Sequence, residues 1–151
     1  MGQIQPIPFL VPLAVGLCVI VATILIHALS LIATVTFYRR ERDLGLTGQR
    51  FWIDVPIVGL AISLALAAHL VEIALWAFVL MITGEFSGFS IAYYRAALSY
   101  TTLGDGGTSP SWSMLGPLAA VDGMLMFGVS TAMIFAVIQH LFRTRYVDLR
   151  S

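Results

Sequence analysis

The chain has 151 residues, of which 59% are hydrophobic and only 11% are charged. A soluble domain carries about 25% charged residues, so the composition excludes a soluble globular protein and indicates an integral membrane protein. The eight acidic and eight basic residues balance, which excludes a nucleic-acid-binding protein that relies on a basic surface. The single cysteine excludes an intrachain disulfide and a cysteine-rich metal site.

Three stretches are long enough to cross a hydrocarbon core, which needs about 20 apolar residues. They run from Pro8 to about Tyr38, from Trp52 to Thr83, and from about Trp112 to Phe142. The first stretch is not a cleavable signal peptide, because it is too long and no positive charge precedes it. The sequence therefore predicts an all-α membrane protein with three transmembrane helices.

The basic residues, all of them arginines, indicate the orientation. All of them except Arg95 follow the first and third spans: Arg39, Arg40, Arg42 and Arg50 after the first, and Arg143, Arg145 and Arg150 after the third. Arginine-rich loops stay in the cytoplasm. We therefore expect a multi-pass protein of a prokaryotic inner (plasma) membrane, with its N-terminus outside, its C-terminus in the cytoplasm, and residues 84–111 outside.

Residues 84–111 form a stretch that is too short and too polar to span. Within it, the helix formers and aromatics from Phe89 to Tyr100 predict a helix, with Ser87 or Ser90 as its N-cap. Twelve residues at 1.5 Å each give a helix of about 18 Å, which reaches halfway into a membrane. Non-helical backbone at that depth must be buried in protein or line water. The layout predicts a re-entrant pore helix followed by a filter strand.

The predicted filter strand is rich in threonine and glycine, and consists of Thr101, Thr102, Leu103, Gly104, Asp105 and Gly106. Alternate glycines allow left-handed backbone, so that successive carbonyls point the same way. Carbonyl rings from several subunits can replace the water shell of a small cation. A simple glycine-rich exterior turn is the alternative.

The order Thr101-Thr102-Leu103-Gly104-x-Gly106 resembles the signature of potassium channels, threonine-threonine-valine-glycine-tyrosine-glycine-aspartate. The resemblance covers residues 52–142 and implies a homotetramer of pore domains, each with an outer helix, a pore loop and an inner helix. Residues 1–51 would add an extra N-terminal helix with an Arg-rich cytoplasmic loop, and residues 143–151 a short cytoplasmic tail.

Two departures from that signature concern the outer half of the filter. Asp105 stands in place of the aromatic residue, and Gly107 in place of the aspartate. This pattern is similar to the bacterial non-selective sodium/potassium channel. It implies passive conduction of K⁺ and Na⁺ with weak selectivity, no enzyme activity and no cofactor. A ring of Asp105 side chains would bind calcium at the outer mouth.

Small residues recur at four-residue spacing along the third span, which lets helices approach closely in lipid. Among them, Gly123 and Gly128 are candidates for a gating hinge, as the resemblance implies. The alternative is that these glycines serve helix packing alone.

Ionisable side chains inside a bilayer are costly and are functional candidates. We expect Arg95, midway along the short helix, to form a structural ion pair with Asp122 of the third span; a role in permeation is the alternative. His69 and Glu72 are three residues apart and share one helix face. Together with His27 they would form a proton sensor, a metal site, or a hydrogen-bonded contact between the first two helices.

The sequence favours a homotetrameric, weakly selective channel for monovalent cations. Its partners would be its own copies and membrane lipids, without nucleic acid or a small-molecule substrate. The alternatives are a potassium-selective channel with an atypical filter, a non-conducting accessory subunit, and a b-type haem subunit with His27 and His69 as axial ligands. The two axial ligands of a haem must lie at the same depth. These histidines lie about 16 Å and about 25 Å from the cytoplasmic helix ends, which argues against a haem site.

Overall fold

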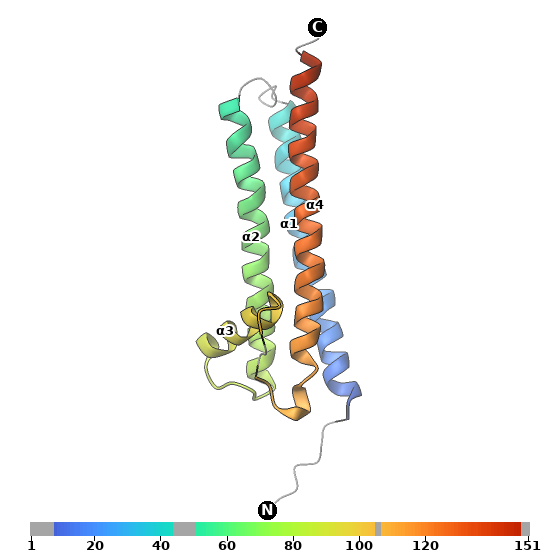
Figure 1. Cartoon of the computed structure of the whole chain (residues 1–151), viewed down its shortest axis with the longest axis vertical. Helices are drawn as coiled ribbons and strands as arrows, with labels where there is room; N and C mark the ends of the chain where they lie inside the picture. Colours follow the sequence, from blue (N-terminus) through green and yellow to red (C-terminus); the bar gives the residue numbers. More distant parts are fainter. Residues whose placement is uncertain (1–7, 44–50, 105–106, 149–151) are drawn as a thin grey trace, which may run out of the picture. The chain divides into compact units, whose positions relative to one another are not determined.

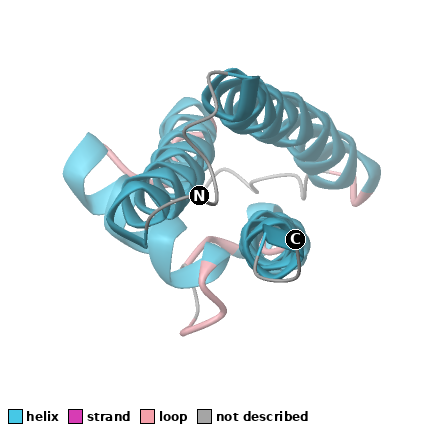
Figure 2. Cartoon of the chain, turned by 90° about the horizontal axis from the view of Figure 1, so that it is seen from above, coloured by secondary structure: helices cyan, strands magenta, loops and turns pink. Residues whose placement is uncertain are grey.

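The computed structural model describes residues 8–43, 51–104 and 107–148. All regular structure in these residues is helical, and none of them lies in a β-strand (Figure 2). The elements in chain order (Figure 1) are α1 Leu10–Asp43, α2 Phe51–Ile82, α3 Phe89–Tyr100, the short 3₁₀ helix η1 Pro110–Trp112, and α4 Leu115–Asp148. The predicted all-α class is confirmed.

Three helical segments are long and apolar enough to cross a membrane. They are Leu10–Glu41 in α1, Val55–Ile82 in α2, and Pro110–Arg143 in η1 and α4. Each overlaps one of the stretches predicted from the sequence. The chain thus fits a multi-pass membrane protein.

The short helix α3 has the bounds that the sequence predicts, Phe89–Tyr100. The predicted serine cap is wrong. The N-cap is Gly88, an extended residue without a side-chain cap, whose carbonyl oxygen accepts the hydrogen bond of the Ala92 amide at 3.0 Å. The serines are not needed, because the main chain of an extended residue supplies the first acceptor of the helix.

The described residues group into two compact units, and α1, α2 and α4 each contribute to both. The first unit comprises the described residues of Met1–Ile26 and His69–Met126. Its core is built around Trp76, Tyr100 and Leu115, each at most 1% exposed. Helix α3 and the predicted filter segment belong to this unit.

The second unit comprises the described residues of His27–Ala68 and Phe127–Ser151. Its buried core consists of Ile57, Val137 and Leu141. An edge-on contact between the rings of Tyr38 and His140, with centroids 5.6 Å apart, joins α1 to α4 within this unit.

Candidate functional site

Helix α3 ends in a hydrogen-bonded turn that reverses the chain. The Thr102 amide donates to the Ser99 carbonyl at 2.9 Å, and the Leu103 amide donates to the Leu98 carbonyl at 2.9 Å. This pair of bonds is the Schellman motif, which requires a left-handed residue just past the helix end. Thr102 is that residue, with φ 61°.

The conformation of this turn differs from the predicted filter strand. Residues 101–104 form a turn and a bend. Gly104 lies outside the left-handed region, so the left-handed backbone predicted there is wrong; the left-handed residues of the described loop are Thr102 and Gly107, both with φ 61°. The physical reason is that reversing the chain after α3 places the left-handed position two residues beyond the helix, before any glycine. Asp105 and Gly106 lie outside the described residues.

Thr102 is strained, because β-branched side chains rarely adopt left-handed backbone. Replacing Thr102 by glycine should therefore raise the free energy of unfolding by about 1 kcal/mol, measured by equilibrium unfolding in detergent. Thr101→Gly is the matched control. Thr101 has φ −84°, and its Oγ1 donates to the Ala97 carbonyl at 2.7 Å, so its replacement should lower stability. A Thr102→Gly variant less stable than the wild type would contradict the strain.

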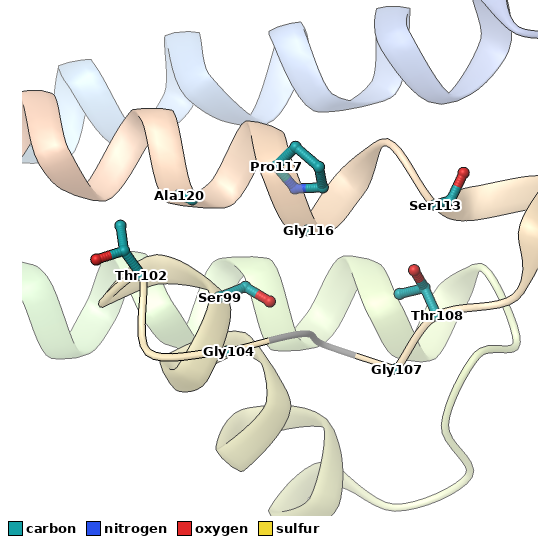
Figure 3. A pocket seen from close by; sticks show the side chains of 9 residues that line it. All are labelled: Ser99, Thr102, Gly104, Gly107, Thr108, Ser113, Gly116, Pro117 and Ala120. Atoms are coloured by element: carbon teal, nitrogen blue, oxygen red, sulfur yellow. The ribbon is translucent and has the colours of Figure 1, made fainter.

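A cavity of about 480 Å³ lies between this turn and the beginning of α4 (Figure 3). Four side chains contribute hydroxyl groups to its lining: Ser99, Thr102, Thr108 and Ser113. Pro117 also lines it and lies in the first turn of α4, where its missing N–H leaves no bond unmade. The described lining residues carry neutral oxygens and no charged side chain. Such a lining can hydrate or coordinate a cation without adding charge.

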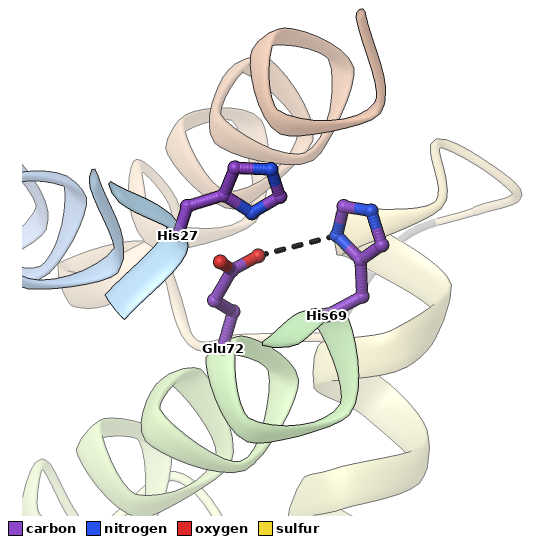
Figure 4. Close-up of side chains that lie close together, drawn as sticks. All are labelled: His27, His69 and Glu72. Carbon is purple, nitrogen blue, oxygen red and sulfur yellow. Dashed lines mark hydrogen bonds and ion pairs between the residues drawn. The ribbon is translucent and has the colours of Figure 1, made fainter. Parts of the chain in front are cut away.

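A buried polar cluster joins α2 to the last residue of α3. The Tyr100 hydroxyl donates a short hydrogen bond to Oε2 of Glu72 and lies 3.1 Å from Nδ1 of His69. His69 Nδ1 lies 3.2 Å from the same Glu72 oxygen (Figure 4), so these two residues share a helix face as predicted. Burial, and after it the hydrogen bond to Glu72, raise the pKa of Tyr100. The phenol therefore stays protonated and acts as the donor.

A second buried carboxylate, Asp122 of α4, joins three helices within the first unit. Its Oδ2 accepts a hydrogen bond from Nε1 of Trp76 in α2 at 2.8 Å, and its Oδ1 accepts one from the Thr23 hydroxyl in α1 at 2.9 Å. Asp122 is fully buried. Both carboxylate oxygens of Asp122 thus accept hydrogen bonds from neutral donors. The predicted ion pair between Asp122 and Arg95 stays a prediction. One Arg95 nitrogen, Nη1, lies 3.3 Å from where a Cβ would stand on Gly107.

His27 belongs to the second unit, where its Nε2 lies 2.9 Å from the Ser130 hydroxyl of α4. The side chain is 2% exposed. His27 therefore has a hydrogen-bond contact inside its own unit. The proton sensor, the metal site and the haem site that would combine His27 with His69 stay predictions.

The two hinge candidates have different surroundings. A Cβ on Gly123 would overlap the carbonyl oxygen of Tyr100, whereas a Cβ on Gly128 would meet nothing within 4 Å. Gly123 therefore has a packing role, because it lets α4 approach the end of α3. Whether either glycine bends during gating stays a prediction.

The half-buried carboxylate of Glu85 ties the start of the loop to the segment that leads back to α4. Glu85, just after α2, accepts hydrogen bonds from the Ser109 amide at 2.5 Å and from the Ser109 hydroxyl at 2.6 Å. Sequence reasoning identified neither residue, and it also missed Thr23, Trp76 and Tyr100. Trp76 could have been found from its spacing, because it lies one helical turn after Glu72 and therefore on the same face of the helix.

Comparisons with protein-family models, with curated proteins and with solved structures find no match to this chain. No family assignment follows. The potassium-channel resemblance rests on residues 101–106 and on their setting between two long apolar helices.

Proposed function

We propose that the chain is one subunit of a homotetrameric channel that passes monovalent cations and discriminates weakly between Na⁺ and K⁺. One observation carries the proposal. A twelve-residue helix between two membrane-length helices ends in a threonine-rich turn beside a hydroxyl-lined cavity. In this proposal α3 enters the membrane from the outside, and the chain lies in a prokaryotic inner membrane with its N-terminus outside.

The strained turn supports a functional role for residues 101–104. A left-handed threonine is costly and is retained where the surrounding structure and the function require it. Thr102 combines this conformation with a side chain that lines the cavity. A plain exterior turn would favour glycine at this position.

The exposed side chains around the turn favour assembly of several copies. Leu103 is 77% exposed and Tyr94 of α3 is 61% exposed. Exposed apolar and aromatic groups of this kind are available for contacts with another copy of the chain. Because each chain supplies one loop, a ring of oxygen ligands around an ion requires several subunits.

The weak selectivity follows from the residue that replaces the signature aromatic. Asp105 cannot supply the aromatic packing that holds the outer half of a selective filter rigid. A shortened stack of fixed sites discriminates less between cations of different size. The proposed permeant ions are therefore both K⁺ and Na⁺, moving down their gradients without an enzymatic step.

The test is the reversal potential of the full chain in lipid vesicles fused to a planar bilayer under potassium/sodium bi-ionic conditions. We expect cation current with a reversal potential near zero, since both ions permeate. Cross-linking in mild detergent should give species up to the tetramer and none beyond it. Absence of current from a tetrameric preparation would contradict the channel function, and a preparation of monomers and dimers alone would contradict the assembly.

A further inference from the structure

Tyr100 occupies the junction between α3 and the turn that follows. It is the last residue of the helix and directly precedes Thr101 and Thr102. Its side chain is fully buried in the core of the first unit. Any displacement of Tyr100 therefore displaces the start of the loop.

The side chain ties this junction to α2. The phenol donates to the carboxylate of Glu72, which is itself fully buried, and it lies 3.1 Å from Nδ1 of His69. A buried acceptor that loses its hydrogen-bond donor cannot turn to water instead, so this bond is costly to break. This bond fixes the distance between the middle of α2 and the end of α3.

The main chain of the same residue rests on α4. The Tyr100 carbonyl oxygen faces Gly123 so closely that a Cβ there would overlap it. Close-packed interiors transmit strain instead of absorbing it. Tyr100 is thus held from two sides, by a hydrogen bond to α2 and by a steric contact with α4.

We propose that the Tyr100 hydroxyl, anchored on Glu72, is a positioning group that sets the ion discrimination of the loop by fixing where Thr101 and Thr102 begin. This inference rests on the proposed channel function. It adds a residue that the filter segment itself does not contain.

The chain offers a matched control on the same helix. The Tyr93 hydroxyl also bonds α3 to α2, donating to the Leu70 carbonyl at 3.3 Å. Tyr93 lies about two helical turns before the loop. Tyr93→Phe therefore removes a longer and less buried phenol hydrogen bond between the same two helices without touching the junction.

The experiment measures the K⁺/Na⁺ permeability ratio of the full chain in vesicles for Tyr100→Phe and Tyr93→Phe. One hydrogen bond is equivalent to about a two- to tenfold change in an equilibrium. We expect the Tyr100→Phe ratio to change by about threefold or more and the Tyr93→Phe ratio to stay that of the wild type. Equal ratios in all three proteins would overturn the inference.

Two further variants keep the test decisive if Tyr100→Phe does not fold. Glu72→Gln retains an acceptor oxygen for the phenol and should keep the wild-type ratio, whereas Glu72→Leu removes the acceptor and should shift it. The same shift in both variants would overturn the anchoring role, because the shift would follow the loss of the carboxyl group and not the loss of the hydrogen bond.

Hydrogen exchange of the full chain in detergent provides a readout that does not need conduction. The amides of Thr102 and Leu103 should exchange about tenfold faster in Tyr100→Phe than in Tyr93→Phe, because their bonds depend on the placement of α3. Faster exchange with an unchanged permeability ratio would overturn the role in discrimination and leave the channel function intact. A wild-type protein without any current would contradict the channel function, and the inference with it.

Discussion

Replacing Gly123 by alanine should lower the free energy of unfolding by about 2–3 kcal/mol, because the added methyl group has no space. It would overlap the carbonyl oxygen of Tyr100, a main-chain atom that no side-chain rotation can move away. The helix end must shift, and the bond between Tyr100 and Glu72 shifts with it. Equilibrium unfolding of the full chain in mixed detergent micelles measures this loss.

Gly128→Ala is the control on the same helix. A Cβ there meets nothing within 4 Å, and alanine is favoured over glycine inside a helix by about 0.8–1.0 kcal/mol. This variant should therefore be at least as stable as the wild type. Equal stability of the two variants would contradict the close packing at Gly123. A change in channel opening without any loss of stability in Gly123→Ala would instead favour the hinge.

The double change Asp105→Tyr with Gly107→Asp should make the proposed channel prefer potassium by about a hundredfold, or about 2.7 kcal/mol at 1.36 kcal/mol per tenfold. It restores the signature of the selective channels that the chain resembles, and with it the aromatic packing behind the filter. The reversal potential under bi-ionic conditions should move from near zero toward that of potassium. A wild-type protein that already discriminates a hundredfold would contradict the weak selectivity, although not the pore.

The local structure at position 107 accommodates this change. Gly107 has φ 61°, and aspartate is among the side chains that adopt the left-handed region more readily. The new carboxylate would also stand near the guanidinium of Arg95. Gly107→Asp alone should fold, and it serves as the control for the effect of the aromatic.

A ring of Asp105 carboxylates should also make external calcium a weak blocker. Open extracellular carboxylate sites bind calcium at about 10⁻⁴ to 10⁻³ M. Asp105→Asn removes the charge at nearly constant size and should relieve the block, as measured by the current at increasing calcium concentration. An unchanged block in this variant would place the calcium site elsewhere.

The helices were predictable because local composition determines them. The spans of α1, α2 and α4 follow from the length of their apolar runs, and α3 lies in the polar interval between two spans. The shared face of His69 and Glu72 follows from their three-residue spacing. None of these predictions needs knowledge of how the chain packs.

The contacts that build the site were not predictable, because they join distant parts of the sequence. Thr23 and Asp122 are separated by 99 positions, and Tyr100 and Glu72 by 28. Nothing in the sequence around this threonine or this tyrosine gives a sign of its partner. The left-handed Thr102 was missed for a different reason, since residue preference favours glycine there and the geometry of the helix end overrides that preference.

The capped end of α3 has a consequence for any ion that approaches it. The carbonyl oxygens of Leu98 and Ser99 each accept an amide, and that of Ala97 accepts both the amide and the hydroxyl of Thr101. Each of these oxygens already accepts at least one hydrogen bond, which weakens it as an ion ligand, so the helix would attract an ion mainly through its long-range field. Such attraction is screened within about 8 Å at physiological ionic strength. In the proposed channel, the enrichment of cations below α3 relative to the bulk solution should therefore decline as bulk salt rises.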